Sequence, residues 1–260
     1  MIHYIKKNSR DTEIILIQHQ NEESVKKRLD IESCFSIEVK LARKLAKFEI
    51  MICNYLQEVE RKEPEVVNFD EFPPEVLIKH PLQHTWTLWY YEPDRNKSWE
   101  ESQRKITSFD TAEDFWSLYN HIKAASELRQ GCDYSMFKQG IRPMWEDDAN
   151  KCGGRWLINL DKKQRNTDLD HFWLETLLCM IGEAFNGYSD DICGAVVNVR
   201  PKGDKIGVWT ANANNEDSVI EIGRKLRERL KIASKVTIGY QIHKDVIVKV
   251  GSQTKNAYVV

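Results

Sequence analysis

GAVVNVRPKGDKIGVWT, residues 194–210, has the pattern of a β-hairpin. Two runs rich in β-branched residues flank residues 201–204, which favour a turn. We therefore predict two antiparallel strands with Arg200 opposite Lys205. Opposed residues point to the same side of a sheet, and that side repeats at every second residue. The side that suits a core carries Ala195, Val197, Val199, Ile206, Val208 and Thr210. The other side carries Val196, Asn198, Arg200, Lys205, Gly207 and Trp209.

Further strands and helices are predicted around this hairpin. Bulky and β-branched residues alternate with polar ones in three further strands, over 84–91, 155–160 and 235–242. Three helices carry start signals, which are Asp110 with Glu113, Thr167 with Asp168, and Asn214 with Asn215. Helices interspersed among hairpin-linked strands favour an antiparallel sheet with helices on one face, an α+β fold. The other face of the sheet would be free to bind a ligand.

The totals exclude several classes of protein. Lys and Arg number 38 against 40 Asp and Glu, so bulk charge does not indicate a nucleic-acid binder and any phosphate recognition must be local. The six cysteines include no C-x-x-C pair, which argues against a zinc ribbon or a disulfide framework and favours a reducing compartment. His80 and His84 have Pro81 between them, which argues against a shared helix face, so no metal site is expected. No membrane span, signal peptide or cofactor is expected either.

The first 64 residues differ from the rest of the chain. They contain no Trp and no Gly, and apolar residues recur at helical spacing within 36–62. We predict a partly helical N-terminal extension over 1–64, an acidic, proline-bearing linker over 65–79 and a main domain over 80–260. The extension is either a solitary amphipathic helix or an arm that binds a partner.

The stretch RPMWEDDANKCGGRW, residues 142–156, places an indole against three carboxylates. Either Trp145 is a core residue beside a solvated acidic turn, or an exposed ring and a carboxylate await a flat, cationic, hydrogen-bonding ligand. Arg155 is expected to leave the core on the same side as Arg200 and Lys205. Three bases beside Trp209 would suit a short anionic chain such as a polyphosphate.

Residues from about His80 to Val260 resemble the eukaryotic translation initiation factor 4E family, which binds the 5′ cap of mRNA. The resemblance runs through HPLQHTWTLWYY, KSWE, FDTAEDFWSLYNHI, PMWEDDANKCGGRWLI, DLDHFWLETLLCMIGE, SDDICGAVVNVRPKGDKI and GSQTKNAYVV. It implies a curved antiparallel sheet of about eight strands that cups the ligand, with three helices on its convex face.

The resemblance also implies the roles of individual residues. Trp99 and Trp145 would stack on either side of 7-methylguanine, and Glu146 would accept hydrogen bonds from its Watson–Crick edge. Trp209 would lie near the methyl group. The triphosphate would be bound by Arg155, Arg200, Lys205 and, more weakly, Lys202. These roles suit the chemistry, because a cationic ring over indole gains about 0.5–2 kcal/mol and a carboxylate is acceptor-only.

A second surface is implied on the back of the sheet. This dorsal patch would consist of His80, Pro81, Trp116, Leu174, Glu175 and Gly182. It would bind a Tyr-x-x-x-x-Leu-hydrophobic helix of the scaffold factor 4G and of competing 4E-binding repressor proteins. The competing interpretation makes Trp116 one more core aromatic. Ser252 corresponds to the family's phosphorylation site.

The function implied is recruitment of 7-methylguanosine-capped mRNA to cap-dependent translation, in the cytoplasm with a nuclear fraction as an open alternative. One alternative is a cap-binding translational repressor of the same fold. Another is a cap or nucleotide hydrolase that uses Glu146, Asp147 and Asp148 with a metal. The sequence has no Walker loop and no nucleophile–base signature, so we expect a protein that is not an enzyme. A third alternative is an interaction module that works through residues 1–64.

Overall fold

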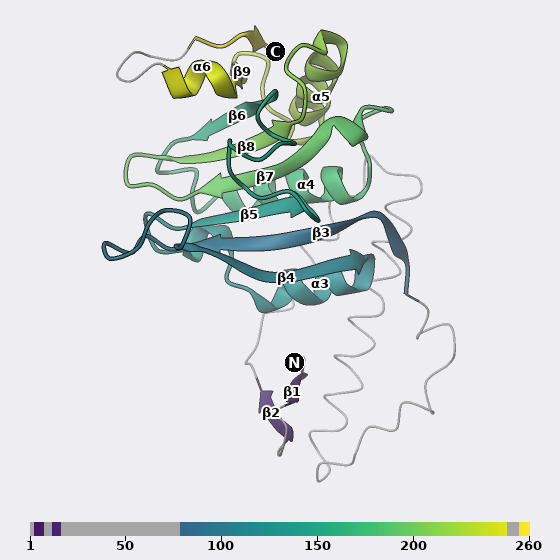
Figure 1. Ribbon diagram of the computed structural model, residues 1–260, viewed down its shortest axis with the longest axis vertical. Coiled ribbons are helices and arrows are strands. Elements are labelled where there is room, and N and C mark those ends of the chain that lie inside the picture. The colour runs from purple at the N-terminus through teal and green to yellow at the C-terminus, as the bar shows by residue number, and fades with distance from the viewer. Residues whose placement is uncertain (1–2, 8–11, 17–78, 249–254) are drawn as a thin grey trace. The chain divides into compact units, whose positions relative to one another are not determined.

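The computed structural model describes residues 3–7, 12–16, 79–248 and 255–260 (Figure 1). The chain divides into two units, 1–78 and 79–260. In the first unit, β1 (His3–Lys7) and β2 (Thr12–Leu16) form an antiparallel pair. The helix expected within 36–62, the linker except for Lys79, and Ser252 lie outside the described residues.

The second unit contains one curved antiparallel sheet, whose described strands number eight in the order β10-β9-β6-β8-β7-β5-β3-β4 (Figure 1). Its strands are β3 (Pro81–Tyr91), β4 (Gln103–Thr111), β5 (Asp133–Lys138), β6 (Gly154–Leu160), β7 (Ile192–Asn198), β8 (Asp204–Thr210), β9 (Gly239–Ile242) and β10 (Tyr258–Val259). The predicted fold class is confirmed. The strand expected over 235–242 is shorter than predicted, and β4, β5 and β10 were not predicted.

Three helices cover one face of this sheet (Figure 1). They are α3 (Ala112–His121), α4 (Leu169–Ile181) and α5 (Glu216–Arg229); a short fourth helix, α6 (His243–Val248), follows β9 and was not predicted. All three long helices contribute to a single core cluster that also contains the apolar side of β7 and β8. The start of α5 is capped by Asn215 as expected, whereas the cap of α3 is Thr111, not Asp110, because the Thr111 hydroxyl accepts from the Asp114 N–H.

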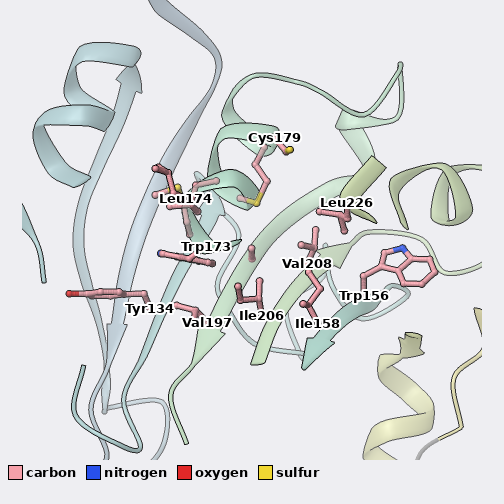
Figure 2. Close-up of a cluster of buried hydrophobic side chains, with 14 of the residues drawn as sticks. Tyr134, Trp156, Ile158, Trp173, Leu174, Cys179, Val197, Ile206, Val208 and Leu226 are labelled. Atoms are coloured by element: carbon pink, nitrogen blue, oxygen red, sulfur yellow. The ribbon is translucent and has the colours of Figure 1, made fainter. Parts of the chain in front are cut away.

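The β7–β8 hairpin is shifted from the predicted register by two residues. Asn198, not Arg200, lies opposite Lys205, because the Asp204 carboxylate accepts the Arg200 backbone N–H at 2.9 Å and widens the turn. A shift of two preserves the sides of the strands. Val197, Ile206 and Val208 accordingly lie in the core against α4 (Figure 2), and Val196 and Trp209 lie on the other face.

The sequence of α4 predicts Phe172, Leu177, Leu178 and Ile181 as its buried residues, and the structure confirms Leu177 and Ile181. Trp173, Leu177 and Met180 define the buried face at helical spacing, each at most 1% exposed. Leu174 is also buried and packs in the core (Figure 2), although the sequence placed it outside. Phe172 and Leu178, which we expected in the core, are only partly buried at its edge.

Candidate functional site

The sheet face opposite the three helices carries a small apolar cluster. Phe137, Cys193, Val196 and Trp209 are buried there, and Trp145 packs partly buried against them. The Trp209 and Phe137 rings meet edge-on, with centroids 5.5 Å apart. The structure thus brings two of the predicted ligand-binding indoles, Trp145 and Trp209, into one cluster on the face predicted to bind a ligand.

The segment that carries Trp145 is held by its own side chains. The Asp147 carboxylate accepts the backbone N–H groups of Arg142 at 3.0 Å and Ala149 at 3.1 Å. The fully buried Asn150 amide donates to the carbonyls of Arg142 at 2.9 Å and Met144 at 2.8 Å. These bonds fix the turn in advance of any ligand.

The two carboxylates after Glu146 therefore differ from each other. The sequence predicts that Asp147 and Asp148 form a solvated turn, which is wrong for Asp147, because its side chain is only 13% exposed and makes the turn. Asp148 is 93% exposed and pairs with Lys151 at the surface. Glu146 itself is exposed, next to Trp145, and no cation among the described residues pairs with its carboxylate.

Trp99 lies on the loop between β3 and β4, and 47% of its surface is exposed. The other seven tryptophans are buried or partly buried. Its ring lies 6.0 Å from that of Tyr91 at an angle of 33°. An ion pair of 2.8 Å between Glu100 and Arg142 joins this loop to the segment that carries Trp145. Two indole-bearing loops, distant in sequence, are thus tethered beside each other.

Arg200 is oriented by a residue that the sequence did not reveal. Its guanidinium donates to both oxygens of Asp133, at 2.5 and 2.9 Å, and remains 37% exposed. Burial raises the pKa of Asp133 above its usual value, while the bond to Asp133 raises the pKa of Arg200. Asp133 is the first residue of β5, and no charge pattern in the sequence identifies it. The β5–β7 pairing, which sets Asp133 opposite Asn198, brings it to Arg200.

Replacing Asp133 by asparagine is expected to lower the free energy of unfolding by about 1–3 kcal/mol, since a half-buried guanidinium loses its counter-charge. Urea unfolding followed by tryptophan fluorescence measures the change. Asp148→Asn is the matched control, because its exposed pair with Lys151 should contribute nothing measurable. Equal midpoints for Asp133→Asn and the unsubstituted chain would contradict the assignment of Asp133.

The remaining bases lie along β6, β8 and the turn before β8. Arg155 is opposite Trp209 in the β6–β8 register. Gly207 lies beneath both, since a Cβ placed there would be 3.6 Å from the Trp209 Nε1 and 3.8 Å from the Arg155 Cδ. Lys205 is exposed on the same side of β8, four residues or about 13 Å from Trp209.

The basic side chains of the site are spread along the sheet and do not converge on one position. Burial lowers the pKa of Arg155, yet an arginine pKa starts so high that the guanidinium stays charged. Lys202 is exposed in the turn next to Arg200. Two arginines and two lysines from one side of the sheet can therefore follow an extended anion along β8.

The dorsal residues occupy the opposite side of the molecule from Trp209. The His80 backbone N–H and ring bond to the Glu113 carboxylate at 2.8 and 2.6 Å, which ties the start of β3 to the start of α3. Trp116 is half-buried, with its ring edge-on to Phe115 at a centroid distance of 5.1 Å, so part of the indole packs on the core and part faces solvent. Leu174 and Glu175 are buried, which limits the surface they offer, whereas Pro81 and Gly182 are exposed.

Within the described residues, no group of three or more His, Cys, Asp or Glu is arranged to hold a metal ion. The helices described there include none with the length and apolar character needed to cross a membrane.

Comparison with known proteins places these features in a family context. The family model described as "Eukaryotic initiation factor 4E" matches residues 81–258. The human protein "Eukaryotic translation initiation factor 4E" is 60% identical over 187 residues, which cover 72% of this chain and 86% of the human one.

Solved structures agree with the sequence comparison. Ascaris suum eIF4E-3, solved with an m7G cap, is similar with a TM-score of 0.67 and 49% identity, covering 70% of this chain and 98% of that chain. C. elegans eIF4E-3, solved with the 4E-binding protein Mextli and a cap analog, has a TM-score of 0.66 and 48% identity, covering 70% of this chain and 100% of that chain.

Proposed function

This chain belongs to the eukaryotic initiation factor 4E family, and we propose that it binds the 7-methylguanosine cap of mRNA and recruits a scaffold protein for cap-dependent translation. The observation that carries the proposal is the pair of tethered loops. They present an exposed Trp99 and a half-buried Trp145, which is followed directly by the exposed Glu146. A resin bearing 7-methyl-GTP tests it directly, because the chain should be released by free 7-methyl-GTP and not by GTP.

The base is recognised by stacking and by charge. Methylation at N7 makes the guanine ring cationic, so two indoles bind it more tightly than the neutral base. Glu146 accepts the N1–H and N2–H donors of its Watson–Crick edge, which adenine and the pyrimidines do not present in the same way. Trp209 is buried in the apolar cluster against which Trp145 packs. In this proposal its ring lies near the methyl group of the base.

The triphosphate follows the row of bases. Arg155 binds at the end next to Trp209, and Arg200, Lys205 and Lys202 bind farther along. Asp133 holds the Arg200 guanidinium in place, so less of its freedom is lost when a phosphate arrives.

We infer that the chain is a binding protein and not an enzyme. The carboxylates that a hydrolase would use to bind a metal do not point to one site. Asp147 accepts backbone N–H groups of its own turn, and Asp148 faces solvent beside Lys151. Incubation with cap dinucleotide and magnesium should release no product. A cytoplasmic location is part of the same proposal, with a nuclear fraction as the alternative.

The dorsal patch binds an amphipathic helix of the scaffold factor 4G or of a 4E-binding repressor, as the Mextli complex of the C. elegans relative supports. Trp116→Ala should weaken binding of a labelled Tyr-x-x-x-x-Leu-hydrophobic peptide about tenfold, since tryptophans dominate such interfaces. Fluorescence anisotropy measures this. Ser117→Ala, an exposed neighbour on α3, is the control and should change nothing.

Co-precipitation with factor 4G distinguishes an initiation factor from a repressor. A chain retained on cap resin that co-precipitates factor 4G acts in initiation. A chain that binds capped RNA but never retains factor 4G is instead a translational repressor.

A further inference from the structure

Two polar side chains next to Trp209 have buried nitrogen atoms that lack hydrogen-bond partners within the described residues. One is Arg155, at its Nε–H, and the other is His243, at both ring nitrogens. His243 is only 1% exposed, and its ring centroid lies 4.3 Å from that of Trp209. Buried polar groups are rarely left unpaired, because each loses its bonds to water and gains none in return. Two of them lie beside Trp209, in the cluster on the sheet face opposite the three helices, which indicates a place where a bound ligand completes the hydrogen bonding.

The position of His243 is fixed by the backbone. Its N–H donates to the Gly153 carbonyl at 3.1 Å, where α6 meets the start of β6 (Figure 1). Gly153 is packed so closely that a Cβ there would lie 1.7 Å from the Thr210 carbonyl oxygen, at the end of β8. The starts of α6 and β6 and the end of β8 therefore form one rigid corner. Imidazole, indole and the Arg155 guanidinium all belong to it.

The imidazole is neutral in this corner. Burial, with the nearby Arg155 charge, lowers the pKa of His243 to about 3. At neutral pH one of its nitrogens therefore carries a proton and donates, and the other accepts. The Arg155 Nε–H is a donor as well. A phosphate oxygen, which carries negative charge and accepts several bonds, satisfies both donors without placing two cations side by side.

We propose that His243 is a binding residue of the cap site, donating an imidazole N–H to the phosphate chain beside Arg155 while its ring packs on Trp209. The inference rests on the proposed function, and it adds a residue from α6 to the row of bases on β6, β8 and the β7–β8 turn. Sequence patterns gave no indication of it, because a single histidine after a strand carries no motif.

The test compares two ligands on two chains. His243→Phe keeps an aromatic ring against Trp209 and removes both nitrogens. Affinity for 7-methyl-GTP should fall about tenfold, whereas affinity for 7-methylguanosine, which has no phosphates, should change less than about twofold. An equal loss for both ligands would mean that the ring only supports Trp209, and no loss for 7-methyl-GTP would mean that it has no role. Either result overturns the proposal.

A second measurement on the unsubstituted chain distinguishes failure of the His243 proposal from failure of the proposed cap binding. The chain's seven histidines can be labelled with ¹⁵N, and His243 identified as the ring whose resonances are missing from the spectrum of His243→Phe. Its nitrogen resonances should move with 7-methyl-GTP and not with 7-methylguanosine; movement with neither ligand refutes the role of His243. Failure of the unsubstituted chain to bind either ligand would instead refute the proposed function, and this inference with it.

Discussion

Trp145→Ala is expected to reduce affinity for 7-methyl-GTP by roughly 30- to 1,000-fold, or about 2–4 kcal/mol. The substitution removes one of the two indoles that enclose the cationic base, together with the apolar surface the ring shares with the Trp209 cluster. Isothermal titration calorimetry at a fixed salt concentration measures the loss, since phosphate contacts respond to ionic strength.

Two controls accompany this variant. Trp145→Phe retains a ring with a weaker attraction for cations, so its loss should fall between those of alanine and the unsubstituted chain. Trp116→Ala, on α3, should leave nucleotide affinity unchanged. An alanine variant that folds normally and binds 7-methyl-GTP as tightly as the unsubstituted chain would remove Trp145 from the site.

Glu146→Gln is expected to weaken 7-methyl-GTP binding by roughly 10- to 150-fold, about 1.5–3 kcal/mol. The amide keeps the size of the side chain, but it replaces two charged acceptors by one neutral acceptor and one donor that faces the N–H groups of the base. Competition against a fluorescent cap nucleotide measures the change.

A ligand without the exocyclic amine makes this test specific. The unsubstituted chain should prefer 7-methyl-GTP over 7-methyl-ITP. Glu146→Gln should reduce that preference, because its amide offers the N2–H group one neutral oxygen in place of a charged carboxylate. Asp148→Asn is the matched control, being exposed and two residues away. A Glu146→Gln chain with undiminished preference would show that another group reads the edge of the base.

The fold was predictable where period-2 patterns were strong. β7 and β8 alternate between a core side and a ligand side, and a register error of two residues left those sides intact. β4 escaped prediction because it is an edge strand with mostly exposed residues, so its hydrophobic alternation is weak. The buried face of α4 was predicted only in part, for Leu177 and Ile181, because that helix is apolar around most of its circumference, with nine buried residues.

The candidate site was predictable where residues carry a recognisable motif, and not where they act through tertiary contacts. Trp99, Trp145 and Glu146 were named from KSWE and PMWEDD. Asp133 and His243 become visible only when strand pairing brings them to Arg200 and Trp209. Asp147 is an intermediate case, because an Asp whose carboxylate accepts the N–H two residues later is a known turn pattern that the sequence already contained.

The central claim is that Trp99 and Trp145 close on a methylated, cationic purine. Titration of the intrinsic tryptophan fluorescence with 7-methyl-GTP and with GTP tests it most directly. We predict strong, saturable quenching by 7-methyl-GTP and only weak quenching by GTP at the same concentrations, with the difference much reduced in Trp99→Ala. Equal quenching by the two nucleotides, or a response that survives the loss of Trp99 unchanged, would contradict the account.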